Sequence, residues 1–210
     1  MKKKLYLASS NAHKRREMQE ILPDYEIRIP SDDGLVFNPV ENGKSFYENS
    51  LIKARALWEI VHEPVIADDS GLCVDGLGGE PGIYTSRYAG PEFMHGKPDG
   101  SKISQEEQNK FLIEQLNETK SENRKCHYTC AMVLLLNSDR FFVAQETFEG
   151  ELVKSIDEQA GSGGFGYDPI VFLPEYGKTV AEISAEEKNK ISHRGKAVKA
   201  IAKILSSLTF

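Results

Sequence analysis

The chain has 210 residues, of which 40% are hydrophobic and 28% charged, and a formal net charge of −6 at pH 7. This length can bury a sizeable core in one domain or in a two-lobed one. The negative charge excludes sequence-independent nucleic-acid binding through a basic surface. The longest apolar run, about Ala131–Leu136, is too short for a bilayer, and no apolar secretory signal follows the first lysines. We therefore expect a cytoplasmic protein without membrane or nucleic-acid partners.

The three cysteines indicate neither a disulfide framework nor a metal site, because the count is odd and low. Cys126 and Cys130 fall on one face of an expected strand, whereas His127 points to the other. A structural zinc ion needs four converging ligands. We expect buried thiols instead.

The first half of the chain alternates strands and helices. "KKLYLAS" predicts a strand that stops at Ser9–Asn11, and Asn11 can cap a helix through about Leu22. "SFYENSLIKARALWEIV" predicts an amphipathic helix whose stripe consists of Phe46, Ser50, Ala54, Leu57 and Val61. A short strand over Val65–Ala67 is expected to end at Asp68–Asp69, before a glycine-rich segment.

The second half adds a predicted hairpin and two more helices. A helix is expected near Ser104–Asn117, and "CHYTCAMVLLL" and "RFFVAQETFEG" predict antiparallel strands joined at Asn137–Arg140. The last helix is expected over about Gly195–Leu208. This alternation with an embedded hairpin predicts an α/β fold with a mixed sheet. No segment is long enough to be an independent linker, so residues 1–210 are expected to form a single domain.

A strand that runs through Ser9, Ser10 and Asn11 into a helix is a candidate anion-binding site. The free N–H groups of the first turn and the helix dipole both favour phosphate. Lys14 adds a positive charge one turn into the helix. An ordinary capped helix with a surface lysine is the alternative that this segment leaves open.

The paired aspartates are the second candidate. Strands of an α/β sheet deliver functional groups at their carboxyl ends, and neighbouring side chains alternate faces if a strand continues. One of Asp68 and Asp69 is therefore expected to face a site, where it could bind a divalent cation or take a proton from water. A polar turn after a strand is the alternative.

Two later segments, a glycine-rich loop and a group of basic residues, are further candidates for ligand binding. Gly161–Pro169 formally matches a dinucleotide-binding glycine pattern, but it lacks the strand before and the helix after that such a site needs. A glycine-dense loop with Phe165 and Tyr167 suits the approach of a flat ligand. Further along, the donors Lys188, Lys190, His193 and Arg194 precede the last helix. An anionic partner would explain them, and a solvated polar turn is the alternative.

Several motifs carry a family resemblance when they are taken together: "SSNAHK", "FYENSLIKA", "ADDSGLCVDGLGGEPGIYTSRYAG", "GFGYDPIVF" and "SHRGKA". In this order, from about Leu5 to Ala200, they resemble the inosine/xanthosine triphosphate pyrophosphatases (XTP/dITP diphosphatases). The main departure is at Thr85–Ser86. The resemblance implies an elongated, two-lobed α/β fold around a long mixed sheet, with a nucleotide cleft between the lobes. It also implies a homodimer that uses Mg²⁺ to convert XTP, ITP or dITP to the monophosphate and pyrophosphate.

The resemblance further implies a role for each matching residue. Asp69 would be the proton acceptor and a metal ligand, with Glu41 as the second acidic ligand and Ser70 on the substrate. The triphosphate would be held by Ser9, Ser10, Asn11, Ala12, His13, Lys14 and Lys53. The base and sugar would be held by Phe165, Gly166, Tyr167, Asp168, Lys188, His193 and Arg194.

Selectivity has a physical explanation on this reading. Hypoxanthine and xanthine carry a carbonyl at C6, where adenine carries an amine, so a donor such as Arg194 would favour the former. Two alternatives stay open. One is a septum-inhibitor-like (Maf-like) pyrophosphatase for other modified nucleotides, although "SSNAHKRR" does not match the first loop expected there. The other is a nucleotide-binding module without catalysis.

Overall fold

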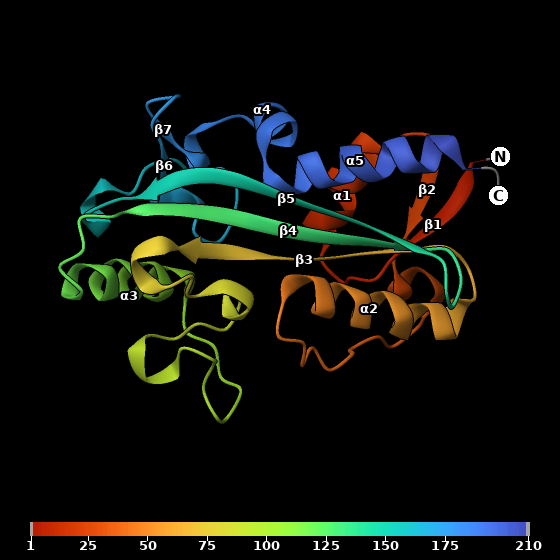
Figure 1. Cartoon of the computed structure of the whole chain (residues 1–210), viewed down its shortest axis with the longest axis horizontal. Helices are drawn as coiled ribbons and strands as arrows, with labels where there is room; N and C mark the ends of the chain where they lie inside the picture. The colour runs from red at the N-terminus through yellow and green to blue at the C-terminus, as the bar shows by residue number, and fades with distance from the viewer. Residues whose placement is uncertain (1, 209–210) are drawn as a thin grey trace. The chain divides into compact units, whose positions relative to one another are not determined.

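The computed structural model describes residues 2–208. Its strands are β1 (Lys3–Leu7), β2 (Tyr25–Arg28), β3 (Val65–Val74), β4 (Lys125–Leu135), β5 (Phe141–Leu152), β6 (Val171–Leu173) and β7 (Lys178–Thr179). Its α-helices are α1 (Ala12–Ile21), α2 (Phe46–Val61), α3 (Gln105–Glu118), α4 (Ala185–Ile191) and α5 (His193–Ser207) (Figure 1). In this described part, no helix has the length and apolarity needed to cross a membrane.

The strands form one sheet in the order β2-β1-β3-β4-β5-β6-β7. β1 pairs in parallel with β2 and β3, whereas β6 pairs antiparallel with β5 and β7. The predicted α/β fold with a mixed sheet is confirmed. The chain divides into two compact units: the first comprises residues 2–69, 130–146 and 193–208, and the second comprises Ser70–Thr129 and Thr147–Ser192.

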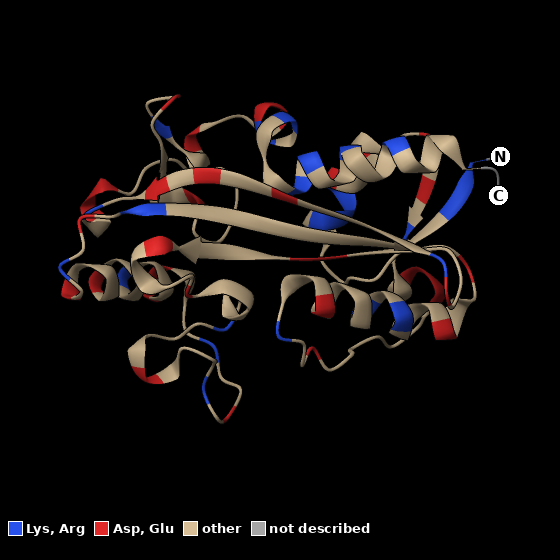
Figure 2. Ribbon diagram, viewed as in Figure 1, with Lys and Arg blue, Asp and Glu red and all other residues tan. Residues whose placement is uncertain are grey.

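The first unit has two apolar layers because its strands alternate their side chains. Cys130, Met132 and Leu134 of β4 pack in one cluster with residues of α1 and α5, and Val133 and Leu135 pack in another with residues of α2. Figure 1 shows α1 and α5 on one face of these strands and α2 on the other. The only charged residue of β4 is Lys125 at its start, as expected for a strand covered on both faces (Figure 2).

The second unit has its own core. Leu112, Ile113 and Leu116 of α3 belong to one buried cluster with residues of β3, β4, β5 and β6. Ser104 and Glu107 form a reciprocal capping box at the start of α3, which fixes where this predicted helix begins. Cys126 is buried in this cluster and Cys130 in a cluster of the first unit, so the thiols are buried as predicted.

One expectation is wrong: β3 does not end at the paired aspartates but continues to Val74. Over the described residues, β1 pairs with β3 only at Val65 and Ile66, so the strand continues through the aspartates beside β4, its other neighbour in the sheet. This pairing outweighs the poor strand propensity of aspartate and glycine. Leu72 and Val74 are fully buried beyond the aspartates and extend the strand's apolar character. Asp68 and Asp69 therefore lie inside a strand, as the charged part of β3 in Figure 2.

Candidate active site

Asp68 and Asp69 point to opposite faces of β3, because successive side chains of a strand alternate. Asp68 contacts residues of α1 and α5, and Asp69 contacts residues of α2, all within the first unit. The two neighbouring carboxylates therefore have separate environments. The sequence predicts that one of them faces a site. In the structure, Asp68 pairs with Lys14 and Arg194, whereas Asp69 pairs with Lys53.

Asp68 is buried, and two cations neutralise it. Its Oδ2 lies 2.9 Å from Lys14 Nζ and 3.3 Å from Arg194 Nε. Among the described residues, Oδ1 has no hydrogen-bond partner, so its ion pairs run through Oδ2. Burial alone would raise the pKa of this carboxyl, but Lys14 and Arg194 outweigh it and hold the pKa well below its usual range. Asp68 is therefore charged at neutral pH and pairs with both cations.

Asp69 is in a different electrostatic position. Its Oδ1 lies 3.3 Å from Lys53 Nζ, and its Oδ2 accepts a hydrogen bond of 3.1 Å from Asn49 Nδ2. Burial raises the pKa of this carboxyl, and Lys53 opposes the rise without cancelling it. A carboxylate with a raised pKa is a stronger base than a free aspartate.

Helix α2 positions the groups that face Asp69. Asn49 and Lys53 are four residues apart and so share one face of the helix. Ser50 is fully buried, and its Oγ donates a hydrogen bond of 2.9 Å to the carbonyl of Ala67, which fastens α2 to β3. Lys53 Nζ also lies 2.7 Å from Glu41 Oε2, so the two carboxylates predicted as metal ligands meet at the same ammonium.

Lys53 remains charged in this setting. Burial would lower its pKa, but the carboxylates of Asp69, Asp68 and Glu41 together raise it. Its side chain is 10% exposed and that of Lys14 is 16% exposed. Each lysine thus presents a small solvent-facing surface while its ammonium is held by carboxylates.

The segment before α1 is an exposed, capped helix start. Asn11 Oδ1 accepts hydrogen bonds from the N–H groups of His13 and Lys14, at 2.9 and 3.3 Å. Ser9 Oγ accepts from Asn11 N at 3.1 Å. Ser10, Asn11, Ala12 and His13 are exposed. The side chain of Asn11 therefore occupies two N–H groups that the sequence suggested for an anion, and Lys14 is directed to Asp68.

The second unit holds the glycine loop, Gly161–Gly166, and the residues around it. Asp168 begins a short 3-10 turn and is 3% exposed. Its Oδ2 lies 2.6 Å from Lys188 Nζ of α4 and accepts from Phe165 N at 2.7 Å. Lys188 Nζ also lies 4.8 Å from the centroid of the Phe165 ring, which is 42% exposed. An exposed aromatic face beside an ammonium suits a planar ligand with acceptor atoms.

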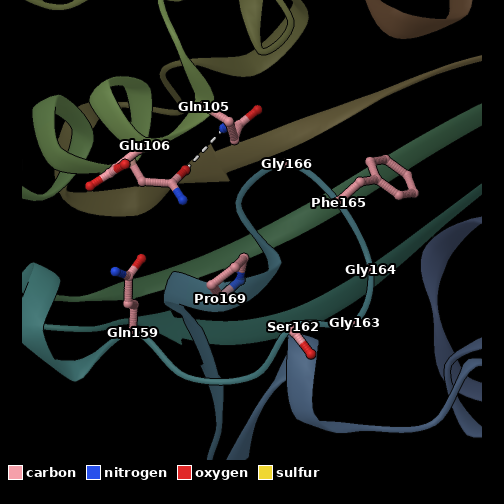
Figure 3. A pocket seen from close by; sticks show the side chains of 10 residues that line it. Gln105, Glu106, Gln159, Ser162, Gly163, Gly164, Phe165, Gly166 and Pro169 are labelled. Carbon is pink, nitrogen blue, oxygen red and sulfur yellow. Dashed lines mark hydrogen bonds between the residues drawn. The ribbon is translucent and has the colours of Figure 1, made fainter.

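A pocket of about 380 Å³ adjoins the glycine loop in the second unit. Its lining comprises Gln105, Glu106, Asn109, Gln159, Ser162, Gly163, Gly164, Phe165, Gly166 and Pro169. Gln105 Nε2 donates to Asn109 Oδ1 at 2.9 Å on its α3 side. In Figure 3 the Phe165 ring points away from Gln105 and Gln159, so the loop contributes mainly backbone to this cavity.

The remaining predicted residues are distributed as follows. Arg194 Nη1 donates to Glu17 Oε2 at 2.8 Å, so with Asp68 two donor atoms of this guanidinium already serve carboxylates in the first unit. His193 is buried at the start of α5, Tyr167 is buried in the second unit's core, and Ser70 is half-buried on β3. Lys190 is exposed and pairs with Glu186 one turn earlier, as is usual on the solvent-facing side of a helix.

Sequence reasoning missed Asn49, Glu17 and Tyr128. Asn49 had a usable signal, because it precedes Lys53 by one helical turn. Glu17 had a similar one, three residues after Lys14 on α1. Tyr128 donates its hydroxyl to Asp168 Oδ1 at 3.1 Å, and nothing in the pattern of its strand indicates this contact.

Gly164 tests how closely Asp168 is enclosed. Its φ is +71°, and an added Cβ would lie 2.0 Å from Asp168 Oδ2. We expect Gly164→Ala to be less stable than a matched variant, Gly177→Ala, by about 1–3 kcal/mol, the usual cost of overpacking. Gly177 has a φ of +62° with nothing within 4 Å of an added Cβ, so it reports the backbone cost alone. Urea unfolding of both variants measures the difference, and equal losses would show that Asp168 moves freely.

The fold and these clusters define an α/β protein with buried carboxylate–cation pairs suited to an anionic, planar ligand. The chain belongs to the Ham1 family, whose model matches residues 5–204. It is 46% identical over 202 residues to a dITP/XTP pyrophosphatase of Treponema denticola, covering 96% of this chain and 98% of that protein. A dITP/XTP pyrophosphatase of Clostridium perfringens is 40% identical, with 95% of each chain covered.

Solved structures agree with this assignment. A HAM1 protein from Coxiella burnetii superposes with a TM-score of 0.87 at 33% identity, covering 98% of this chain and 100% of that one. The Ham1 protein of Staphylococcus aureus gives a TM-score of 0.83 at 34% identity, covering 97% and 98%. The predicted family resemblance is confirmed.

Proposed function

We propose that this protein hydrolyses the non-standard purine nucleoside triphosphates XTP, ITP and dITP to the monophosphate and pyrophosphate, and so removes them from the nucleotide pool. The observation that carries the proposal is the pair Asp68–Asp69 on β3, each carboxylate held by its own lysine. It occurs in a chain 40–46% identical to proteins named dITP/XTP pyrophosphatase. The alternatives of a Maf-like pyrophosphatase and of a binding module are outcomes of the test below.

The triphosphate is proposed to bind at the cations of the first unit. Lys14 and Lys53 supply positive charge at fixed positions, because carboxylates orient both ammonium groups. Donors from the exposed loop would complete this part of the site, namely Ser9, Ser10, Asn11, Ala12 and His13, with Ser70 from β3. Such pre-oriented charge stabilises phosphate oxygens without reorganisation during the reaction.

The base is proposed to bind at the glycine loop of the second unit. The Phe165 ring offers a stacking face, and Lys188 offers a donor to a C6 carbonyl. Gly166, Tyr167 and Asp168 shape the loop. The family resemblance implies His193 and Arg194 as further contacts to the base or the sugar. An adenine amine would meet the Lys188 ammonium donor to donor, which a buried polar site rejects strongly.

Glu41 and Asp69 fit a divalent cation. Both are carboxylates, and an oxygen of each lies within 3.3 Å of one ammonium, so the two converge. Mg²⁺ is commonly held by one or two carboxylates plus phosphates and water, so two converging carboxylates are enough for this ion. When bound, Mg²⁺ would neutralise phosphate charge and acidify water.

Asp69 is proposed to accept the proton of the attacking water. The water oxygen bonds to the α-phosphorus, the bond to the bridging oxygen of the β-phosphate breaks, and pyrophosphate leaves. The raised pKa of Asp69 favours this proton transfer. Asn49 holds Oδ2 in place, and Lys53 faces Oδ1.

One assay tests the function. The protein is incubated with ITP, XTP, dITP, ATP, GTP and a panel of other modified nucleoside triphosphates, with Mg²⁺ or after treatment with EDTA, and monophosphate, pyrophosphate and orthophosphate are measured. We expect Mg²⁺-dependent pyrophosphate release from ITP, XTP and dITP and little from ATP. Turnover of other modified nucleotides alone would support the Maf-like alternative, and no turnover would support a binding module.

The family resemblance also motivates two further proposals, a homodimer and a cytoplasmic location. Light scattering coupled to size-exclusion chromatography measures the first, and cell fractionation measures the second. A monomer at the concentrations of the activity assay would contradict the dimer without affecting the proposed reaction.

A further inference from the structure

Asp168 is held by three donors that come from different parts of the second unit. Tyr128 Oη, on β4, donates to Oδ1 at 3.1 Å. Lys188 Nζ, on α4, lies 2.6 Å from Oδ2, to which Phe165 N also donates at 2.7 Å. Asp168 and Tyr128 are 3% and 8% exposed, so these contacts are made away from bulk water.

The carboxylate has little freedom on its Oδ2 side. Lys188 and the Phe165 N–H converge there, and a Cβ on Gly164 would overlap Oδ2. The Tyr128 hydroxyl is the contact on the Oδ1 side, and it fixes the rotation of the carboxylate about its own axis. Burial and the nearby Asp168 carboxylate both raise the pKa of this hydroxyl, so it stays protonated and remains a donor.

Through Asp168, the hydroxyl also affects the two groups proposed to meet the base. The carboxylate sets the position of the Lys188 ammonium and of the Phe165 backbone, and that ammonium lies over the Phe165 ring. A shift of Asp168 would move a donor and a stacking face together. Tyr128 itself lies in a core cluster with Phe148 and Leu152, so its ring is rigidly placed.

We propose that Tyr128 is a positioning residue for base recognition: through Asp168 it holds Lys188 and Phe165 in the arrangement that prefers a C6 carbonyl over a C6 amine. The inference rests on the proposed function. To that function the inference adds a residue that makes no contact with the nucleotide and that affects only selectivity.

The first test is Tyr128→Phe, which removes one oxygen atom and keeps the ring. Tyr88→Phe is the matched control, because Tyr88 is fully buried in the same cluster and its hydroxyl donates to Gln115 instead. kcat and KM are measured for ITP and ATP. We expect Tyr128→Phe to lower kcat/KM for ITP by roughly tenfold, mainly through KM, with no matching loss for ATP. Tyr88→Phe should keep the wild-type ratio of kcat/KM for ITP to kcat/KM for ATP.

The ratio of the two kcat/KM values separates positioning from a general loss of structure. Both substrates are hydrolysed by the same folded molecules, so partial unfolding lowers both values equally and leaves the ratio unchanged. Asp168→Asn changes the residue through which Tyr128 is proposed to act. It should also lower the ratio of kcat/KM for ITP to kcat/KM for ATP. An unchanged ratio in both variants would overturn the inference.

A double variant tests whether Tyr128 acts through Lys188. If it does, Tyr128→Phe should have no further effect on the ratio in a Lys188→Gln background. Multiplying losses would instead show that the hydroxyl acts by another route, which contradicts the inference. A wild-type protein with no preference for ITP would refute the proposed function itself. A preference that survives in Tyr128→Phe refutes only the positioning role.

Discussion

Replacing Asp69 with asparagine is expected to lower kcat for ITP hydrolysis by about 10³-fold while leaving the protein folded. The amide cannot accept the proton of the attacking water, and it is a poorer ligand for Mg²⁺. Asn49 can still bond to the new side chain, and Lys53 keeps its 2.7 Å contact with Glu41, so the local structure should survive. The measurement is pyrophosphate release at saturating ITP, with circular dichroism to confirm the fold.

The control is Asp157→Asn, because Asp157 is an exposed aspartate of the second unit. It should keep the wild-type kcat. If Asp69→Asn retained more than about a tenth of the activity, neither proton transfer nor metal binding could depend on this carboxylate.

Replacing Asp68 with asparagine should lower the stability of the fold. The change leaves Lys14 and Arg194 facing a neutral side chain where a buried carboxylate balanced them. Removing one partner of a buried ion pair usually costs about 3–5 kcal/mol of unfolding free energy. Glu17 keeps one contact to Arg194, which favours the lower end of this range. Urea unfolding monitored by circular dichroism measures the loss.

Asp33→Asn is the matched control for this measurement. Asp33 also pairs with an arginine, Arg28, but at the surface, where ion pairs contribute little. It should be much less destabilised than Asp68→Asn. Equal losses in the two variants would mean that burial of Asp68 does not determine its contribution.

Most of the fold could be predicted because its long elements have strong patterns. α2 carries its apolar stripe over 16 residues, and β4 is a long apolar run that a polar turn joins to β5. β2, β6, β7 and α4 were missed because they have between 2 and 7 residues, too few to establish a period. These short elements form through sheet pairing and capping by their neighbours.

The candidate site shows a similar division. Lys53 and Asp69 could be singled out from the sequence, and the structure brings them within 3.3 Å of each other. What could not be predicted is which carboxylate serves which cation, since that depends on the face of β3 each one occupies. The contact of Tyr128 with Asp168 joins residues 40 positions apart, and it follows only from tertiary packing.

The continuation of β3 through its aspartates has a consequence for how this protein can change. Asp68 and Asp69 differ by one position, yet that single step decides which carboxyl has its pKa lowered by Lys14 and Arg194 and which has its pKa raised by burial. Loss or addition of one residue between Val65 and Asp69 would exchange their faces and bring each carboxylate to the wrong helix. Length variation in homologous chains should therefore be confined to the loops, with the residue count of this strand kept constant.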